Sequence, residues 1–129
     1  MAIGEWVPSE RKEISLEKLR QYVEFASTLN LDDIKASLPL INIKTDKTLM
    51  KHPVADWVLA NDLADDELVG LVRFFTLAEV QLPEWDGGRQ SPVIYLVKIL
   101  KQRSAFDAEL RKWIKAHTDN RYLPNGAAL

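Results

Sequence analysis

The segment HTDNRYLPNG, from His117 to Gly126, gathers several reactive side chains within a few positions. They are the imidazole of His117, the carboxylate of Asp119, the carboxamide of Asn120, the guanidinium of Arg121 and the phenol of Tyr122. Such groups can transfer protons or hold an anion, so one hypothesis is the edge of an active site. The same groups can end a helix and fasten a tail, because histidine suits a helix C-terminus and asparagine tolerates its closing left-handed conformation. We expect a docked C-terminal tail over 119–129.

A second stretch with possible chemistry is the loop LPEWDGGRQSP, residues 82–92. Gly87, Gly88 and Arg89 precede a predicted helix, whose free N–H groups and dipole favour an anion. The spacing matches neither common phosphate-binding motif, and a Gly-Gly pair is chiefly turn chemistry, so a plain turn is the competing interpretation. A loop tryptophan either packs over the core or anchors a partner. The candidate binding residues are Trp85, Arg89, Asp119, Arg121 and Tyr122.

Metal and nucleophile chemistry have little support in the sequence. His52 and His117 are far apart, and neither belongs to a spacing that puts two ligands on one helix face. There is no cysteine and no G-x-S-x-G motif. The carboxylates at 65–67 are explained by the preference of a helix's first turn for acids. We therefore predict no catalytic residue, no cofactor and no metal, and lean towards a protein that is not an enzyme.

The net charge of −2 conceals an uneven distribution. From His52 to Gly87 there are eight acidic residues and one arginine, whereas Gly88 to Leu129 holds eight basic and three acidic residues. Acidic and basic surfaces of this kind can attract each other or a charged partner, although surface charge often serves solubility alone. The candidate basic surface consists of Lys98, Lys101, Arg103, Arg111, Lys112 and Lys115.

Length and composition predict one globular domain, residues 1–129, with an extended N-terminal arm over 1–14. The absence of cysteine, of a recognisable signal peptide and of a long apolar run leads us to expect a cytoplasmic protein that is not in a membrane.

Apolar residues at three- and four-residue spacing predict an all-α fold, a compact bundle or orthogonal array of five to six helices. Ser15 and Ser91 suit helix caps, and Pro92 suits a first turn. The stretch LPLINIKTDKTL, residues 38–49, has β-branched residues and alternates over 40–43, but a single strand would have no obvious partner, so we predict a loop. The predicted helices span 15–29, 32–38, 53–61, about 65–81, 92–103 and 107–118. The 53–61 helix should have Val54, Trp57 and Val58 on one side. The 65–81 helix should be capped by Asp62 or Asp65 and should be the central helix, because it is apolar on most sides.

Two structural questions stay open from the sequence. The run VIYLVKIL, residues 93–100, has high β-propensity, but the preceding Ser-Pro favours a helix. Arg73 is the lone base of the predicted central helix; it is either buried with a carboxylate partner or extends to the surface.

The function that these features favour is a small non-enzymatic protein–protein interaction or regulatory module, one that can associate with itself through its acidic and basic surfaces. The first alternative is nucleic-acid binding through the basic C-terminal third, although a pI of about 5.7 argues against it. The second is a small anionic-ligand binder or enzyme that uses the 85–91 loop and the 119–122 tail.

Overall fold

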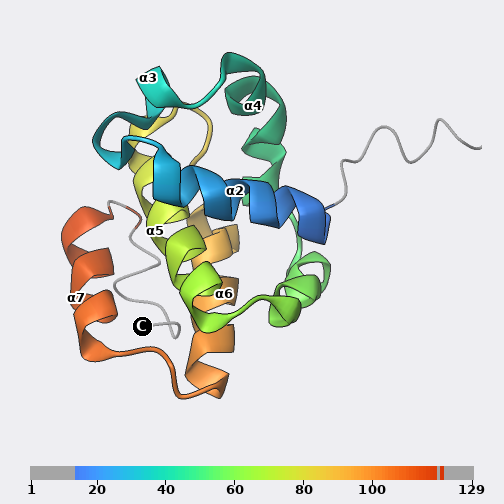
Figure 1. Ribbon diagram of the computed structural model, residues 1–129, viewed down its shortest axis with the longest axis vertical. Coiled ribbons are helices and arrows are strands. Elements are labelled where there is room, and N and C mark those ends of the chain that lie inside the picture. Colours follow the sequence, from blue (N-terminus) through green and yellow to red (C-terminus); the bar gives the residue numbers. More distant parts are fainter. Residues whose placement is uncertain (1–13, 119, 121–129) are drawn as a thin grey trace, which may run out of the picture.

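The longest helix, α5 (Asp65–Gln81), lies at the centre of the fold. The computed structural model describes residues 14–118 and 120, and within them α5 contacts α2 (Leu16–Thr28), α3 (Ile34–Ser37), α6 (Pro92–Gln102) and α7 (Ala108–His117). Figure 1 shows α5 running through the middle, crossed by α2 and with α7 along one side. The acids of its first turn lie where the helix dipole favours them; Asp65 and Asp66 are exposed and Glu67 is half-buried. The predicted central helix is confirmed.

Helix starts follow the capping residues closely. The Ser15 hydroxyl accepts a hydrogen bond from the Lys18 N–H at 3.0 Å, and the Ser91 hydroxyl accepts one from the Val93 N–H at 3.2 Å. Asp107 caps α7 in the same way. The predicted cap of α5 is wrong, because Ala64 is the N-cap and the Glu67 carboxylate accepts the Ala64 N–H at 2.9 Å. A glutamate in the first turn therefore replaces the expected aspartate cap.

Residues 40–51 are helical, which corrects the predicted loop. They form α4 (Leu40–Thr45) and the 3₁₀ helix η2 (Asp46–Lys51). The apolar pattern is misleading here, because Leu40 and Ile41 are 64% and 70% exposed while Asn42 is buried. Asn42 is buried because its amide donates to Asp46 at 2.9 Å, one turn along the chain.

The segment after Pro53 is the 3₁₀ helix η3 (Val54–Asp62). It packs against α6 and α2 and buries Trp57, but Val58 is 66% exposed, so the predicted apolar side is wrong for Val58. A 3₁₀ helix has three residues per turn, which turns a neighbour of a buried residue further away than an α-helix would. The described part of the chain also holds two shorter 3₁₀ helices, η1 (Leu31–Asp33) and η4 (Gly88–Gln90).

The fold class is all-α, as predicted. No strand occurs in 14–118 and 120, and residues 92–102 are helix, which answers the question of 93–100. The Ser-Pro start decides against the β-propensity of this run, since Ser91 caps the helix and Pro92 occupies its first turn. The 1–14 arm lies outside the described residues, except for the buried Ile14.

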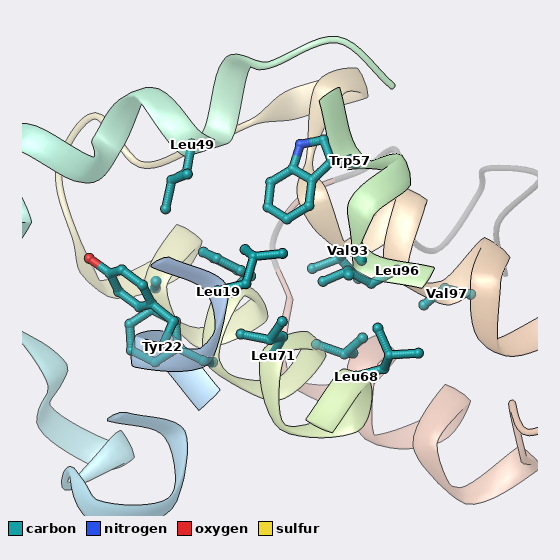
Figure 2. Packing of buried hydrophobic residues seen from close by; sticks show 14 of the residues in the cluster. Leu19, Tyr22, Leu49, Trp57, Leu68, Leu71, Val93, Leu96 and Val97 are labelled. Carbon is teal, nitrogen blue, oxygen red and sulfur yellow. The ribbon is translucent and has the colours of Figure 1, made fainter. Parts of the chain in front are cut away.

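Aromatic side chains from distant parts of the chain meet in the core. Tyr22 of α2 lies with its ring centroid 5.1 Å from Phe74 and 6.0 Å from Phe75, both on α5. Trp57 meets Phe75 edge-on at 6.0 Å. Figure 2 shows Trp57 above Val93 and Leu96, and Tyr22 on the other side of Leu19 and Leu71. The core thus joins α2, α5, α6 and η3 into one unit.

A buried polar cluster ties α4 and η2 to α2. The Tyr22 hydroxyl donates to the Asp46 carboxylate at 2.6 Å, and Lys18 Nζ lies 3.2 Å from the same oxygen. Burial alone would raise the pKa of Asp46, but hydrogen bonds from Tyr22, Asn42 and Lys18 outweigh it and lower the pKa below its ordinary 3.8. The pKa of Tyr22 is raised above its ordinary value, chiefly by burial and next by the hydrogen bond and charge of Asp46. Its hydroxyl therefore keeps its proton and stays a donor.

We expect Tyr22→Phe to lower the free energy of unfolding by about 1–3 kcal/mol at pH 7, because a charged buried acceptor loses a donor. Since the folded pKa of Asp46 is depressed, its contribution is present above the unfolded pKa and is lost as the pH falls through the folded pKa. In Tyr22→Phe this pKa moves up towards the unfolded value, so less stability is lost on acidification and the loss ends at a higher pH. Urea unfolding from neutral to acidic pH measures both effects; an unchanged acid profile would contradict the role given to Tyr22.

Candidate functional site

The structure places Trp85 inside the protein. Its side chain is fully buried, and its indole N–H donates to the Ile43 carbonyl at 3.0 Å, which fastens the 82–91 loop to α4. The ring centroid lies 6.4 Å from that of Tyr22. Of the two interpretations of this loop tryptophan, packing is the one that the structure supports, and Trp85 offers no surface to a ligand.

The glycine pair is a turn with two separate requirements. Gly87 is buried, and a Cβ there would lie 2.7 Å from the Ser91 Cα and 3.0 Å from the Met50 carbonyl. Gly88 has a φ of +57°, the left-handed region that glycine adopts without strain. The side chain of Arg89 lies outside the described part of the structure.

Behind this turn lies a buried carboxylate that sequence reasoning missed. Glu79 of α5 is 6% exposed and accepts hydrogen bonds from the Ser91 hydroxyl and from the Asn120 amide, the latter at 3.0 Å. Ser91 is the N-cap of α6, so the Glu79 carboxylate lies at the same helix N-terminus that the anion-binding hypothesis for the 82–92 loop requires. This arrangement argues against a phosphate site there. A glutamate between Ala78 and Val80, within an apolar helix, was the available signal.

Of the C-terminal tail, the structure describes Asn120. Its amide also donates to the Gly88 carbonyl at 2.9 Å, so Asn120 joins the end of α7 to both the 82–91 loop and Glu79. The expected left-handed helix end at Asn120 is wrong, because α7 ends at His117 and its C-cap Thr118 is extended. Asp119, Arg121, Tyr122 and the rest of 119–129 lie outside the described residues.

Arg73 and His117 both lie against Trp113 of α7. Arg73 is exposed, with its guanidinium carbon 5.6 Å from the Trp113 ring centroid, so it extends to the surface from the central helix. The His117 ring stacks on Trp113 at 4.2 Å between centroids, and His117 Nδ1 lies 2.7 Å from the Trp113 carbonyl. This contact supports the helix-capping interpretation of His117.

The candidate basic residues divide between two helices. Arg103 is half-buried and holds the connection between η3 and α5: its guanidinium donates to the carbonyls of Leu63 and Asn61 and pairs with Asp65 at 2.9 Å. Lys101 of α6 lies 5.7 Å from the Phe106 ring, and Lys98 is exposed beside η3. The remaining three, Arg111, Lys112 and Lys115, are exposed on α7, and we call them the basic strip.

Lys115 follows Arg111 by four positions and Lys112 by three, so the three side chains lie on one side of the helix, turned away from the buried Leu110 and Ile114. The acidic counterpart, which we call the acidic corner, consists of the exposed Asp62, Asp65 and Asp66 where η3 meets α5. In Figure 1, α7 lies on one side of α5 and the η3–α5 connection on the other. Opposite charges therefore lie on separated surfaces of one molecule.

His52 and Asp56 form a close pair, with His52 Nδ1 2.8 Å from the Asp56 carboxylate. In the part of the chain that the structure describes, no group of three or more His, Asp or Glu side chains is placed to hold a metal ion. Within the same part, no helix is both long and apolar enough to cross a membrane. Comparison of the chain with protein-family models, curated proteins and solved structures found no match.

Proposed function

We propose that this chain is a protein-binding module that associates with further copies of itself, the basic strip of one copy contacting the acidic corner of the next. The observation that carries the proposal is the placement of Arg111, Lys112 and Lys115 on one side of α5 and of Asp62 and Asp66 on the other. Charges separated in this way cannot neutralise each other within one molecule, but they are complementary between molecules.

The internal ion pairs support this choice of surfaces. Asp65 pairs with Arg103, Glu67 lies 3.8 Å from Arg20 and Glu84 pairs with Lys47 at 2.6 Å. Among the described residues, none of the three cations of the basic strip forms an ion pair. The basic strip therefore retains its charge for a contact with another molecule.

The buried polar groups support a non-enzymatic role. Glu79 with Ser91, and Asp46 with Tyr22, are two close pairs that chemistry could use, and each of these pairs is buried and joins structural elements. Ser91 is fully buried and already caps α6, so its hydroxyl is not presented to a substrate.

The contact joins two different surfaces, so it can repeat from copy to copy instead of closing into a symmetric pair. Exposed ion pairs contribute about 0.2–1 kcal/mol each, and salt screens them, so we expect weak association. Light scattering should give an average mass that rises with protein concentration at about 20 mM salt and returns to the monomer mass at about 500 mM. A monomer mass at every concentration in low salt would contradict the proposal.

Nucleic acid is the other partner that the same cations could bind. It predicts affinity for duplex DNA with a steep salt dependence, together with a mass that stays monomeric without DNA. The role of Arg103 in holding Asp65 favours the protein partner, because the basic third then does not form a single free surface. DNA binding without self-association would therefore count against the proposal.

A further inference from the structure

A pocket of about 160 Å³ opens between η3 and α6. One face of α6 lines it, with residues at successive three- and four-residue spacing, and η3 supplies the facing wall. This volume is close to that of a cavity that accepts a benzene ring. The lining residues are Trp57, Val58 and Asn61 from η3, and Tyr95, Lys98, Ile99 and Gln102 from α6.

The inner part of the pocket is apolar and aromatic. Trp57 and Ile99 are 1% and 7% exposed, and the ring centroids of Trp57 and Tyr95 lie 6.5 Å apart. Val58 also lines the pocket and is 66% exposed, so it lies at the mouth. An aromatic or branched aliphatic group entering the pocket would cover Val58 and gain hydrophobic contact.

The mouth of the pocket is polar and carries a positive charge. Among the described residues that line it, Lys98 carries the one charge, and it is exposed. Asn61 and Gln102 add side-chain amides, which can donate hydrogen bonds. An ammonium group beside two amides selects a ligand with an anionic oxygen group and disfavours a cation.

Two features of η3 are unusual for a purely structural segment. Trp57 Nε1 is buried and has no hydrogen-bond partner among the described residues, and Figure 2 shows it on the side of the ring away from Val93 and Leu96. An unsatisfied buried N–H in a native protein calls for an explanation, such as local strain or a functional site nearby. η3 also runs for nine residues as a 3₁₀ helix, a conformation seldom sustained beyond three or four, and such stretches often mark a functional hinge or local strain.

We propose that this pocket binds a carboxylate attached to an aromatic or branched aliphatic group, with the apolar group between Trp57, Tyr95 and Val58 and the carboxylate at Lys98. The chemistry is shared by a small carboxylic acid and by the C-terminal residue of a protein. The pocket uses none of the charged residues of the basic strip or the acidic corner, so the proposal does not rest on the proposed self-association; Asn61 of the pocket adjoins Asp62 of the acidic corner.

Titrations of the full chain with phenylacetate, phenylacetamide and phenethylamine, followed by NMR of the amide and indole N–H groups, test the proposal. A dissociation constant of about 0.1–10 mM is expected for phenylacetate, given its ten non-hydrogen atoms. The NMR signals of the Trp57 indole and of residues 95–102 should shift. Phenylacetamide and phenethylamine should bind at least about fivefold more weakly than phenylacetate. Equal binding of the three probes, or no saturable shift at these residues, would overturn the proposal.

Variants separate the pocket from a general charge effect. Lys98→Gln should weaken phenylacetate binding about fivefold or more, and Val58→Ser should weaken it through loss of apolar contact. Lys35→Gln removes the same charge from an exposed position on α3 and should leave binding unchanged. Because Lys98 and Val58 are exposed, the variants should fold, which the dispersion of the same spectra checks. Equal effects of Lys98→Gln and Lys35→Gln would contradict a specific site.

A peptide separates the two sources of the carboxylate. Acetyl-Gly-Gly-Phe with a free C-terminus should bind more tightly than phenylacetate, and its C-terminal amide should not, if the natural ligand is a protein end. Binding of phenylacetate without binding of the peptide supports a small carboxylic acid instead. If Lys98→Gln leaves the binding of both carboxylates unchanged, the site is not the one proposed.

Discussion

Trp85→Ala should lower the free energy of unfolding by about 3–5 kcal/mol. The side chain is fully buried against Tyr22 and Phe74, with ring centroids 6.4 and 6.5 Å away, so its removal leaves a large cavity. It also leaves the Ile43 carbonyl without the indole donor. A domain of this size is stable by only about 5–15 kcal/mol, so the loss should be evident as a much lower urea midpoint.

Trp85→Phe is the matched control, because it keeps an aromatic ring and removes the indole N–H. We expect it to cost less than Trp85→Ala, since most of the buried area remains. The alternative in which Trp85 anchors a partner predicts little change in stability. A loss below about 1 kcal/mol in Trp85→Ala would therefore contradict the position that the structure gives it.

Gly87→Ala should lower the free energy of unfolding by about 2–3 kcal/mol, because the added methyl group collides with backbone atoms. The nearest is the Ser91 Cα at 2.7 Å, which the N-cap role of Ser91 and its bond to Glu79 hold in place. The φ of Gly87 is −92°, a conformation that alanine adopts freely, so crowding is the cause.

Gly88→Ala is the matched control for Gly87. It has no atom within 4 Å of the added Cβ but has a φ of +57°, so its cost is conformational, about 1 kcal/mol. Urea unfolding of the two variants should therefore rank Gly87→Ala as the more damaging. The reverse order would show that crowding at Gly87 is relieved at little cost.

The sequence predicts the parts of the fold whose signals are local. Ser15 and the Ser91-Pro92 pair mark helix starts through bonds to the next few residues, and the apolar stripe of α5 marks the centre. It fails for Asn42, because burial there depends on Asp46 and Tyr22, which no local pattern connects. The prediction for Val58 is wrong because apolar spacing does not distinguish a 3₁₀ helix from an α-helix.

The candidate sites follow the same rule. The basic strip lies on one side of one helix, so its spacing in the sequence predicts it. The ion pair between Arg103 and Asp65, in contrast, joins residues 38 positions apart. The bond between Glu79 and Asn120 spans 41 positions and joins α5 to the segment that follows α7, which only the tertiary fold brings together. Charge counts along the sequence indicate an excess of either sign, but they do not tell which charges an internal partner already neutralises.

Self-association through opposite charges is tested most directly by exchanging those charges between two variants. Lys112→Glu with Lys115→Glu reverses the basic strip, and Asp62→Lys with Asp66→Lys reverses the acidic corner. Each variant alone should stay monomeric at low salt, because its two surfaces now carry the same sign. Lys35→Glu with Lys44→Glu changes two other exposed lysines by the same charge and should keep the wild-type association.

An equimolar mixture of the two reversed variants retains one unaltered basic strip and one unaltered acidic corner. Sedimentation of this mixture at low salt should show complexes that contain both variants and that about 500 mM salt dissociates. Two monomers that do not interact in the mixture, with the wild type associating under the same conditions, would contradict the assignment of these surfaces.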